Sequence, residues 1–544
     1  MKRIVIVGGG FSGVYAAQAL ERRLRGRVDW EIVLFARENY FVFQPMLPEV
    51  ISGTIGLTDV VSPLRRMLAR THVHVRDVES IDVGRQTVTA APGFRPHAHV
   101  LAYDHLVLAP GTVTDFRGLP GLPEHALPFK NLSDALEVRS RVIRALEEAD
   151  LEEDDPELQR QLLTFVMAGG GFSGVEVAAE LNDFVRDVVR HYRRIDPNAV
   201  RVVLVHSGDE ILPEMAPELR QFAARILRRR GVELVLGQRL KAATGASAIL
   251  GDGTVIPTKT LISTIPASPH PLIDALALPK TRNGRLQVDR TLRVTGFENV
   301  WALGDCAAVP TKDGTPCPPT AQHATRQAAV VGDNIAACSS ARPLRNFDFG
   351  GLGKMGSLGR RNAVAEVFGL RLSGFVAWFL WRTIYLAKLP GWGRRIKVAS
   401  AWTLDLVLAP ELVELRLGGT GGAMHEHFEP GQDVFSEGEI GDRVYILLSG
   451  KADVVRRVPG LGQGGGGERV LARLGPGECF GEMALLDSAP RNASVRCVEA
   501  MTVLSIPKRE FGLLAANVPG LRASFEQVTA RRNLPAPAAH PPRA

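Results

Sequence analysis

The chain twice shows an apolar run, a cluster of glycines and a stretch of helical character in direct succession. Residues 4–7 read IVIV, a β-branched run of the kind that is buried in a parallel sheet, and the glycines of residues 8–13 follow at once. The same order returns in residues 165–189, where even the Phe-Ser pair between the glycines is repeated. The pattern therefore predicts two strand, loop and helix units in an α/β fold.

Both glycine clusters have the spacing G-x-G-x-x-G, whose three glycines have different physical roles. The first permits a tight turn, the second lets the backbone approach a pyrophosphate, and the third lets the helix pack closely on the strand. The N–H groups at the start of the helix are free to bind phosphate. The glycines in these roles are Gly8, Gly10 and Gly13 in the first cluster and Gly169, Gly171 and Gly174 in the second. We expect both loops to bind a dinucleotide, the alternative being a purely structural loop.

A third segment supports two dinucleotides. Residues 299–306, NVWALGDC, form an apolar run that ends in Gly-Asp and resembles the second flavin motif of flavoproteins with two dinucleotide-binding domains. The resemblance implies that Asp305 binds the ribityl chain of FAD, whereas the residues alone also allow Asp305 to cap a helix. Two dinucleotides in one chain indicate a bound flavin facing an exchangeable nicotinamide, with hydride transfer between them.

The second strand of each unit lacks the acidic residue that usually binds the ribose hydroxyls, because the strands run into Ala36 and His206. Glu38 lies two residues beyond the first of these positions and is the candidate ribose ligand for FAD. In the second unit, His206 and Ser207 remove a negative charge that would repel a 2′-phosphate. Both NADH and NADPH therefore stay open as the hydride donor.

The five cysteines exclude several classes of protein. They lie at positions 306, 317, 338, 479 and 497 with no CxxC pair, so neither a disulfide framework nor a zinc knuckle is predicted, and we assign no metal site. Residues 1–305 contain no cysteine, which excludes a relay from flavin to a redox disulfide. The clustering of the first three cysteines disfavours a sulfide:quinone reductase.

Several further segments resemble the type II NADH:quinone oxidoreductases over roughly residues 1–410. They are Asn39-Tyr40 to Phe43-Gln44-Pro45, Gly174-Val175-Glu176, Ile211-Leu212-Pro213 and Ala321-Gln322. The resemblance implies FAD, a nicotinamide donor, a quinone acceptor and no proton pumping. It places Glu176 beside the flavin and nicotinamide rings and Gln322 at the quinone site. From the residues alone, Glu176 could also be a carboxylate stabilised by the dipole in the first turn of its helix.

One position departs from that family. Arg326 stands four residues after Gln322, where the family commonly has a second glutamine, and Gln327 follows it. Because residues i and i+4 share a helix face, we assign Arg326 to the quinone site and leave the identity of the acceptor open.

The net charge of +7 is concentrated in one region of the chain. Residues 341–400 hold eleven Lys and Arg against Asp348 and Glu366, a local charge of +9. A single basic patch does not indicate nucleic acid. Residues 374–390 are apolar almost all round but near the lower length limit for crossing a bilayer, and Arg382 and Lys388 interrupt them.

The aromatic residues of this segment indicate a lipid interface, where rings lie among headgroups and cations meet anionic lipid. They are Trp378, Trp381, Tyr385 and Trp392. The alternative is a buried helix at a dimer or interdomain interface, and we expect a homodimer. A strand that begins at the third or fourth residue leaves no room for a secretory signal. We therefore expect a cytoplasmic protein, peripheral on the inner face of the cell membrane.

The C-terminal region of the chain is rich in short β-runs. Within it, Phe480 to Leu486 and Pro490 to Ser494 resemble the phosphate-binding cassette of cyclic-nucleotide-binding domains. The resemblance implies that Glu482 binds the ribose 2′-hydroxyl and Arg491 the cyclic phosphate, with Gly481 and Ser494 in the same cassette. Asn492 does not separate cAMP from cGMP. A domain of this fold that has lost its ligand is the alternative.

We therefore predict an α/β protein with two Rossmann-like dinucleotide-binding domains, for FAD and NAD(P)H, and a C-terminal β-roll cyclic-nucleotide-binding domain. The expected divisions are a first FAD-binding segment (1–115), linker helices (116–162), NAD(P)H-binding domain (163–280), a second FAD-binding segment (281–345), basic aromatic segment (346–415), Gly-rich linker (416–424), cyclic-nucleotide-binding domain (425–530) and disordered tail (531–544). The expected function is an NAD(P)H:quinone oxidoreductase regulated by cyclic nucleotide. The alternatives are a cyclic-nucleotide or redox sensor with low turnover or a non-quinone acceptor, and an enzyme whose terminal domain is only structural.

Overall fold

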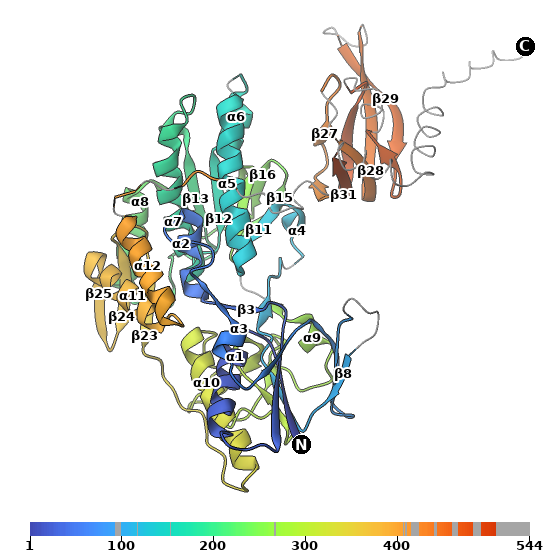
Figure 1. Ribbon diagram of the computed structural model, residues 1–544. Helices are drawn as coiled ribbons and strands as arrows, with labels where there is room; N and C mark the ends of the chain where they lie inside the picture. The colour runs from blue at the N-terminus through green and yellow to red at the C-terminus, as the bar shows by residue number, and fades with distance from the viewer. Residues whose placement is uncertain are drawn as a thin grey trace, which may run out of the picture.

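The computed structural model describes residues 1–92, 99–116, 118–152, 154–265, 268–405, 407–408, 411–414, 424–439, 443–459, 466–481 and 491–507. The Glu482 position, the interior of the expected Gly-rich linker and the expected tail lie outside these residues. Two parallel sheets, one above the other, and a separate β domain make up the architecture (Figure 1).

The first sheet is built around the apolar run at the start of the chain. Its strand β1 (Lys2–Val7) carries four consecutive side chains, Ile4 to Val7, that are at most 4% exposed. The five parallel strands lie in the order β21 (Val300–Ala302), β9 (His105–Leu108), β1, β2 (Trp30–Ala36) and β5 (His72–Val75). The sheet is thus completed by β21, which follows the second sheet in the sequence.

Two long helices cover one face of the first sheet. Helix α1 (Phe11–Arg23) packs closely on α10 (Ala321–Cys338) because Gly332 has no side chain. A Cβ at Gly332 would lie 2.6 Å from the Cβ of Ala19.

A three-stranded meander extends the domain: β6 (Val78–Asp82), β7 (Thr87–Ala90) and β8 (His99–Ala102). Shorter elements complete it: β3 (Tyr40–Val42), η1 (Gln44–Met46), α2 (Pro48–Ser52), β4 (Val61–Pro63), α3 (Leu64–Met67), α9 (Pro271–Asp274), β20 (Leu286–Gln287), η4 (Gly304–Cys306) and β22 (Ala307–Ala308).

The second sheet repeats this plan. Its parallel strands lie in the order β11 (Ala126–Pro128), β18 (Thr260–Ser263), β12 (Thr164–Ala168), β13 (Arg201–Val205) and β14 (Val232–Val235). The helices of this domain are α5 (Leu132–Leu151), α6 (Pro156–Leu162), α7 (Phe172–Val188) and α8 (Pro217–Arg229), with the short turns η2 (Val189–His191) and η3 (Pro197–Ala199). An antiparallel meander follows: β15 (Leu240–Thr244), β16 (Ser247–Leu250) and β17 (Val255–Pro257).

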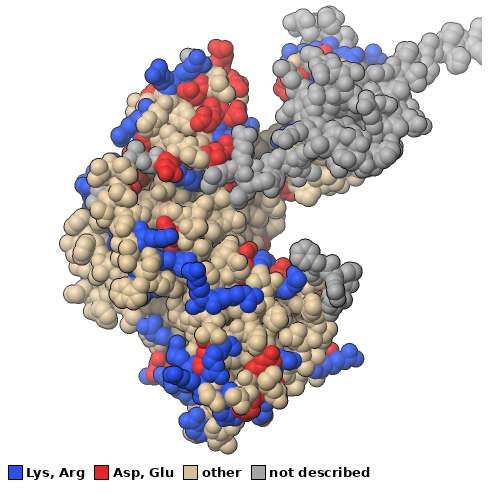
Figure 2. All heavy atoms as spheres, viewed as in Figure 1, with Lys and Arg blue, Asp and Glu red and all other residues tan. Residues whose placement is uncertain are grey.

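The two sheets are joined by a pair of short crossover strands. Strand β10 (Thr112–Val113) leads out of the first sheet and pairs with β19 (Ser268–Pro269), which leads back. Helix α4 (Leu122–His125) follows β10 directly along the chain. At the far end of the second domain, acidic side chains gather over α5 and α6 (Figure 2).

The basic aromatic segment forms a small sheet and two helices beside α7 and α8. The sheet consists of β23 (Gly353–Ser357), β24 (Ala363–Val367) and β25 (Leu370–Ser373), and the helices are α11 (Gly374–Lys388) and α12 (Trp392–Leu404). Ala377 and Trp381 of α11 are buried. No helix among the described residues combines the length and the apolar character needed to cross a bilayer.

The C-terminal domain is an antiparallel sheet with its own small core. Its strands are β26 (Met424–Phe428), β27 (Asp433–Phe435), β28 (Arg443–Pro459), β29 (Gly466–Leu474), β30 (Cys479–Phe480) and β31 (Ser494–Pro507). The long strand β28 pairs with β29, β30 and β31. The sequence predicts two short strands here, at residues 443–448 and 452–456, and the structure joins them in the single strand β28. The predicted fold class is confirmed.

Candidate functional site

The first glycine loop has the geometry that its three roles require. Gly8 has φ +118, and a Cβ there would lie 2.1 Å from the carbonyl oxygen of Ala109. A Cβ at Gly13 would lie 1.9 Å from the carbonyl oxygen of Gly8. By contrast, a Cβ at Gly10 would meet nothing within 4 Å. The outer glycines are thus fixed by close backbone packing, and the central one faces open space where a phosphate group fits.

The second loop repeats this geometry. Gly169 has φ +120, and a Cβ at Gly174 would lie 1.8 Å from its carbonyl oxygen. Gly171 again faces open space. Neither Gly10 nor Gly171 provides a side-chain cap for the helix that it precedes, so the N–H groups at the starts of α1 and α7 are available to phosphate. The residues present therefore fit two dinucleotides.

The two ribose positions differ from each other. Glu38 is exposed, two residues beyond β2, and contributes with burial to the raised pKa of Tyr40. His206 follows β13, and its Nδ1 accepts a hydrogen bond of 3.1 Å from the Gly170 N–H. Burial lowers the pKa of His206, which keeps the ring neutral and able to accept. His206 thus lies against the loop where a ribose-binding carboxylate is usual.

Asp305 lies in a small pocket at the end of β21. The pocket is lined by Arg285, Gly304, Asp305, Ala307, Cys317, Pro318, Pro319, Thr320, His323, Ala324 and Gln327. Burial raises the pKa of Asp305, while the cations Lys130 and Arg285 oppose the shift. Asp305 lies inside the turn η4 rather than before it, so the alternative that it caps a helix is wrong. The Asp305 carboxylate is therefore placed where it could accept a hydrogen bond from a hydroxyl of the ribityl chain.

Two residues of this region were missed as functional candidates. Lys130 is largely buried and contacts the carbonyl and hydroxyl of Thr112 on crossover strand β10. The side-chain oxygen of Gln327 accepts a hydrogen bond of 2.8 Å from the Gly304 N–H and holds the turn that carries Asp305. The sequence offered one signal for Gln327. It lies on the same helix as Gln322 but five residues further on, so its side chain points to another face of α10. Nothing in the sequence pointed to Lys130.

Glu176 lies on α7, where this helix packs against β23 of the basic segment. It is the fifth residue of the helix, so the first-turn position that the sequence suggested is wrong. Its Oε1 accepts a hydrogen bond of 3.0 Å from the Ser357 N–H of β23. Burial raises the pKa of Glu176 to about 8. A carboxyl with this pKa can exist in either protonation state near neutral pH.

Gln322 and Arg326 lie one turn apart on α10. The Gln322 Nε2 donates to the Gly353 carbonyl at 3.1 Å, and its Oε1 accepts from the Leu352 N–H at 3.0 Å. Both ends of the amide therefore fasten the loop that leads into β23. The Arg326 Nη1 donates to the Gln322 carbonyl at 3.0 Å, and its guanidinium lies 4.0 Å from the centre of the Phe349 ring.

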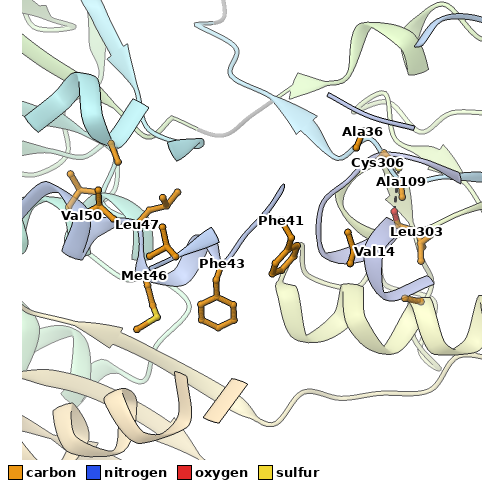
Figure 3. Close-up of a cluster of buried hydrophobic side chains, with 14 of the residues drawn as sticks. Val14, Ala36, Phe41, Phe43, Met46, Leu47, Val50, Ala109, Leu303 and Cys306 are labelled. Atoms are coloured by element: carbon orange, nitrogen blue, oxygen red, sulfur yellow. Dashed lines mark hydrogen bonds between the residues drawn. The ribbon is translucent and has the colours of Figure 1, made fainter. Parts of the chain in front are cut away.

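An apolar cluster of buried side chains lies between the first glycine loop and α11. Phe43 and Met46 point from the segment between β3 and α2 towards the helices of the basic segment, while Val14 and Leu303 lie on the side of the first glycine loop (Figure 3). The ring of Phe43 meets that of Tyr385 edge to face at 6.0 Å.

The C-terminal cassette is only partly within the described residues. Gly481 has φ +82, and Arg491 is 4% exposed. The Arg491 guanidinium donates to the carbonyls of Gly481 at 2.6 Å and Arg443 at 2.8 Å and lies 4.0 Å from the Phe435 ring centre. The Ser494 hydroxyl accepts from the Glu437 N–H at 2.9 Å. Arg491 thus contacts protein carbonyls here, and its binding to a cyclic phosphate stays a prediction.

Among the described residues, no group of three or more His, Cys, Asp or Glu side chains is placed to hold a metal ion.

Comparison with known proteins gives matches over most of the chain. The pyridine nucleotide-disulphide oxidoreductase family matches residues 2–328, and the cyclic nucleotide-binding domain matches residues 425–517. A type II NADH:quinone oxidoreductase of Mycobacterium tuberculosis is 33% identical over 420 residues, which are 74% of this chain and 88% of the relative. A demethylphylloquinone reductase of Synechocystis is 33% identical over 412 residues, 74% of this chain and 95% of the relative.

A solved structure agrees at the level of fold. NDH2 from Plasmodium falciparum in complex with NADH superposes with a TM-score of 0.71 at 18% identity, covering 76% of this chain and 99% of that one. The chain therefore belongs to the pyridine nucleotide-disulphide oxidoreductases and, within them, to the type II NADH:quinone oxidoreductases, with a cyclic nucleotide-binding domain at its C-terminal end.

Proposed function

We propose that this protein is an FAD-dependent NAD(P)H:quinone oxidoreductase that does not pump protons. The observation that carries the proposal is the pair of matching glycine loops, each with an open central glycine, on two sheets joined by short crossovers. FAD supplies the hydride acceptor of the first half-reaction and the two-electron donor of the second. The relatives named above are quinone reductases, which supports the same acceptor here.

Each proposed site has its own group of side chains. Gly8, Gly10, Gly13, Glu38 and Asp305 hold FAD, and Gly169, Gly171 and Gly174 hold NAD(P)H. Glu176 lies at the nicotinamide side of the flavin site. Gln322 and Arg326 line the quinone side, where burial and Arg326 together lower the pKa of Lys388. A cation there stabilises negative charge on a quinone oxygen as it is reduced.

Membrane attachment is proposed for the outer faces of α11 and α12. Phe375, Val376 and Phe379 of α11 are 58–62% exposed, and Trp392 and Ile396 of α12 are 77% and 63% exposed. The corresponding surface is almost free of charge in the space-filling view, with basic side chains beside it (Figure 2). A peripheral position on the inner face of the cell membrane would bring the quinone site to its lipid-dissolved substrate. A homodimer through the same face is the competing use of this surface.

Regulation by cAMP or cGMP is proposed through the contact between the C-terminal domain and α4. Helix α4 and strand β15 both pack against β26, so the C-terminal domain contacts the domain that carries the second glycine loop. The contacts of Arg491 with two protein carbonyls favour a second candidate, a terminal domain that binds no nucleotide. A shift in thermal unfolding with cAMP or cGMP separates the two, because a ligand of the native state must stabilise it.

The test of the enzymatic function is turnover of the purified flavoprotein with NADH and NADPH and a short-chain quinone in detergent. Quinone-dependent turnover with either donor is the expected result. Flavin reduction without reoxidation by quinone would exclude a quinone reductase and leave either a non-quinone acceptor or a slow redox sensor.

A further inference from the structure

Three glutamates lie close together where helices α2, α7, α11 and α12 converge. Glu49 of α2 and Glu180 of α7 are 3% and 7% exposed, and Glu176 lies one turn before Glu180 on α7. Helices α11 and α12 cover them from the side of the basic segment. The chemistry assigned to flavin, nicotinamide and quinone uses Glu176 but leaves the other two carboxyls without a role.

Glu49 is held by two side chains of the basic segment. Its Oε1 lies 3.5 Å from Arg382 Nη2, and its Oε2 accepts from the Trp402 Nε1 at 3.1 Å. The Arg382 guanidinium lies between the Trp378 and Trp402 rings, 4.2 and 4.6 Å from their centres. Glu49 is thus the carboxyl nearest to the cation.

Glu180 contacts the hydroxyl of Ser52, and this hydroxyl has more hydrogen-bond acceptors around it than it can donate to. The Ser52 Oγ lies 2.9 Å from Glu180 Oε2, 3.1 Å from the Glu49 carbonyl oxygen and 3.0 Å from Thr54 Oγ1. Ser52 has one proton and can donate to only one acceptor. If Glu180 carries a proton, it donates to Ser52, and Ser52 is then free to donate to the Glu49 carbonyl.

The charges around the group are unbalanced. Arg382 is the cation that acts on Glu49 and Glu180, and Asp183 and Asp405 add negative charge. Asp183 is itself paired with Arg230 and accepts from the Arg360 N–H. Two buried carboxylates, Glu49 and Glu180, beside one guanidinium cannot both be ionised at low cost. Burial accordingly raises the pKa of Glu49 to about 7 and that of Glu180 to about 8.

A separate observation lies beside Glu176. Trp381 is 2% exposed, and its indole N–H has no hydrogen-bond partner of normal geometry, although it faces the Glu176 carboxyl. The Tyr385 ring meets the Trp381 ring edge to face at 4.8 Å, and burial raises the pKa of its hydroxyl. The Trp381 N–H thus favours the ionised form of Glu176 and opposes the effect of burial on the pKa of that carboxyl.

The net reaction needs such a proton. NAD(P)H + H⁺ + quinone gives NAD(P)⁺ + quinol: the hydride brings two electrons and one proton, and the second quinol proton must come from elsewhere. At the quinone side, Arg326 and Gln322 carry no proton that they can give up readily. Lys388 there could lose a proton only by giving up the positive charge that stabilises a reduced quinone oxygen.

We propose that Glu180 and Glu49 hold this proton and pass it to Glu176. From Glu176 the proton reaches the flavin and the quinone. The inference rests on the proposed quinone reductase function. The two residues act through Glu176 and are positioning and proton-holding residues, not catalytic ones. In each turnover one of the two carboxyls loses its proton and is then reprotonated from solvent.

The test compares Glu180→Gln and Glu49→Gln with Glu298→Gln, which changes an exposed carboxylate on the first domain. Anaerobic stopped-flow measurements follow flavin reduction by NADH and flavin reoxidation by a short-chain quinone separately across pH. We expect reduction to stay within about twofold and reoxidation to fall by roughly tenfold or more in Glu180→Gln, because a positioned proton donor commonly contributes that much. Glu180→Asp should restore part of the rate. Glu49→Gln gives a second measurement if Glu180→Gln does not fold.

Infrared spectra of the full-length flavoprotein give a readout that does not depend on turnover. The carbonyl band of a protonated carboxyl should be present at neutral pH and should lose intensity in Glu180→Gln but not in Glu298→Gln. An unchanged band, or unchanged reoxidation at every pH, overturns the proposal. If the wild-type protein does not reduce quinone at all, the proposed function fails, and the infrared band still decides whether Glu180 holds a proton.

Discussion

The imidazole of His125 at the end of α4 lies against the backbone of His427 in β26. The His427 N–H donates to His125 Nε2 at 2.9 Å. Burial lowers the pKa of His125 to about 4, so the ring is neutral at physiological pH and accepts this bond. Because α4 follows crossover strand β10, the C-terminal domain contacts the chain where it passes from one sheet to the other.

Replacing His125 with alanine should weaken this contact. We expect a loss of about 1 kcal/mol of stability, the usual value of one hydrogen bond. If cyclic nucleotide acts through α4, the ratio of NADH oxidation rates with and without it should approach one in His125→Ala. His191→Ala, an exposed histidine of η2, is the control. An unchanged ratio in His125→Ala would show that coupling takes another route.

The buried glutamates should make stability fall as pH rises. The pKa of Glu180 rises from an ordinary 4.5 to about 8 in the folded chain, so the folded state binds more protons than the unfolded state between these values. The stability contributed by the neutral form is present below the ordinary pKa and is lost as pH rises through the folded one. Glu49 and Glu176 act in the same direction.

Urea unfolding of wild type and Glu180→Gln at about pH 6 and about pH 9, on either side of the folded pKa, measures this effect. We expect the variant to gain stability relative to wild type at the higher pH. An equal difference at both pH values would contradict a raised pKa.

The open central glycines allow the two dinucleotide sites to be separated. Gly10→Ala should fold, because its Cβ meets nothing within 4 Å, but its methyl group intrudes on the phosphate and should lower the flavin retained per chain. Gly171→Ala should keep flavin and raise KM for the nicotinamide donor. Gly13→Ala is the structural control, since its Cβ would lie 1.9 Å from the Gly8 carbonyl, and we expect it to lose about 1–3 kcal/mol of stability. Flavin absorbance, KM and thermal unfolding distinguish these outcomes.

A carboxylate at position 206 should change the preference for the donor. His206→Asp places a negative charge where a 2′-phosphate would lie, and we expect kcat/KM for NADPH to fall roughly tenfold or more relative to NADH. Comparable losses with both donors would place the adenosine ribose away from this residue.

The exposed face of α11 should decide membrane binding. Phe379→Asp introduces a charge at a 62% exposed position, and we expect weaker sedimentation with anionic lipid vesicles. Added salt should weaken wild-type binding, because it screens the basic residues from the lipid. Leu151→Asp changes a 71% exposed leucine at the acidic end of α5 and serves as control. If Phe379→Asp instead converts dimers to monomers and binds vesicles normally, this face is a dimer interface.

The sequence predicted those features of the site that depend on local backbone geometry. The glycine loops and Asp305 belong to short segments whose spacing already specifies a turn and a phosphate cradle. It misplaced Glu176 by one turn because the apolar pattern did not reveal that α7 starts at Phe172. Glu49, Glu180 and Arg382 come from three distant segments, and only tertiary packing brings them together. Arg491 was expected to face a phosphate, and its contacts with backbone carbonyls depend on strand β28.

The pairing of β9 with β21 determines the order in which the protein can form during synthesis. The second sheet uses strands from residues 126–263 and has all its strands before β21 leaves the ribosome. The first sheet lacks an edge strand, and Asp305 is absent, until residues 300–305 have been made. The nascent chain can therefore complete the second sheet first, whereas the first sheet stays open at one edge until residues 300–302 pair with β9.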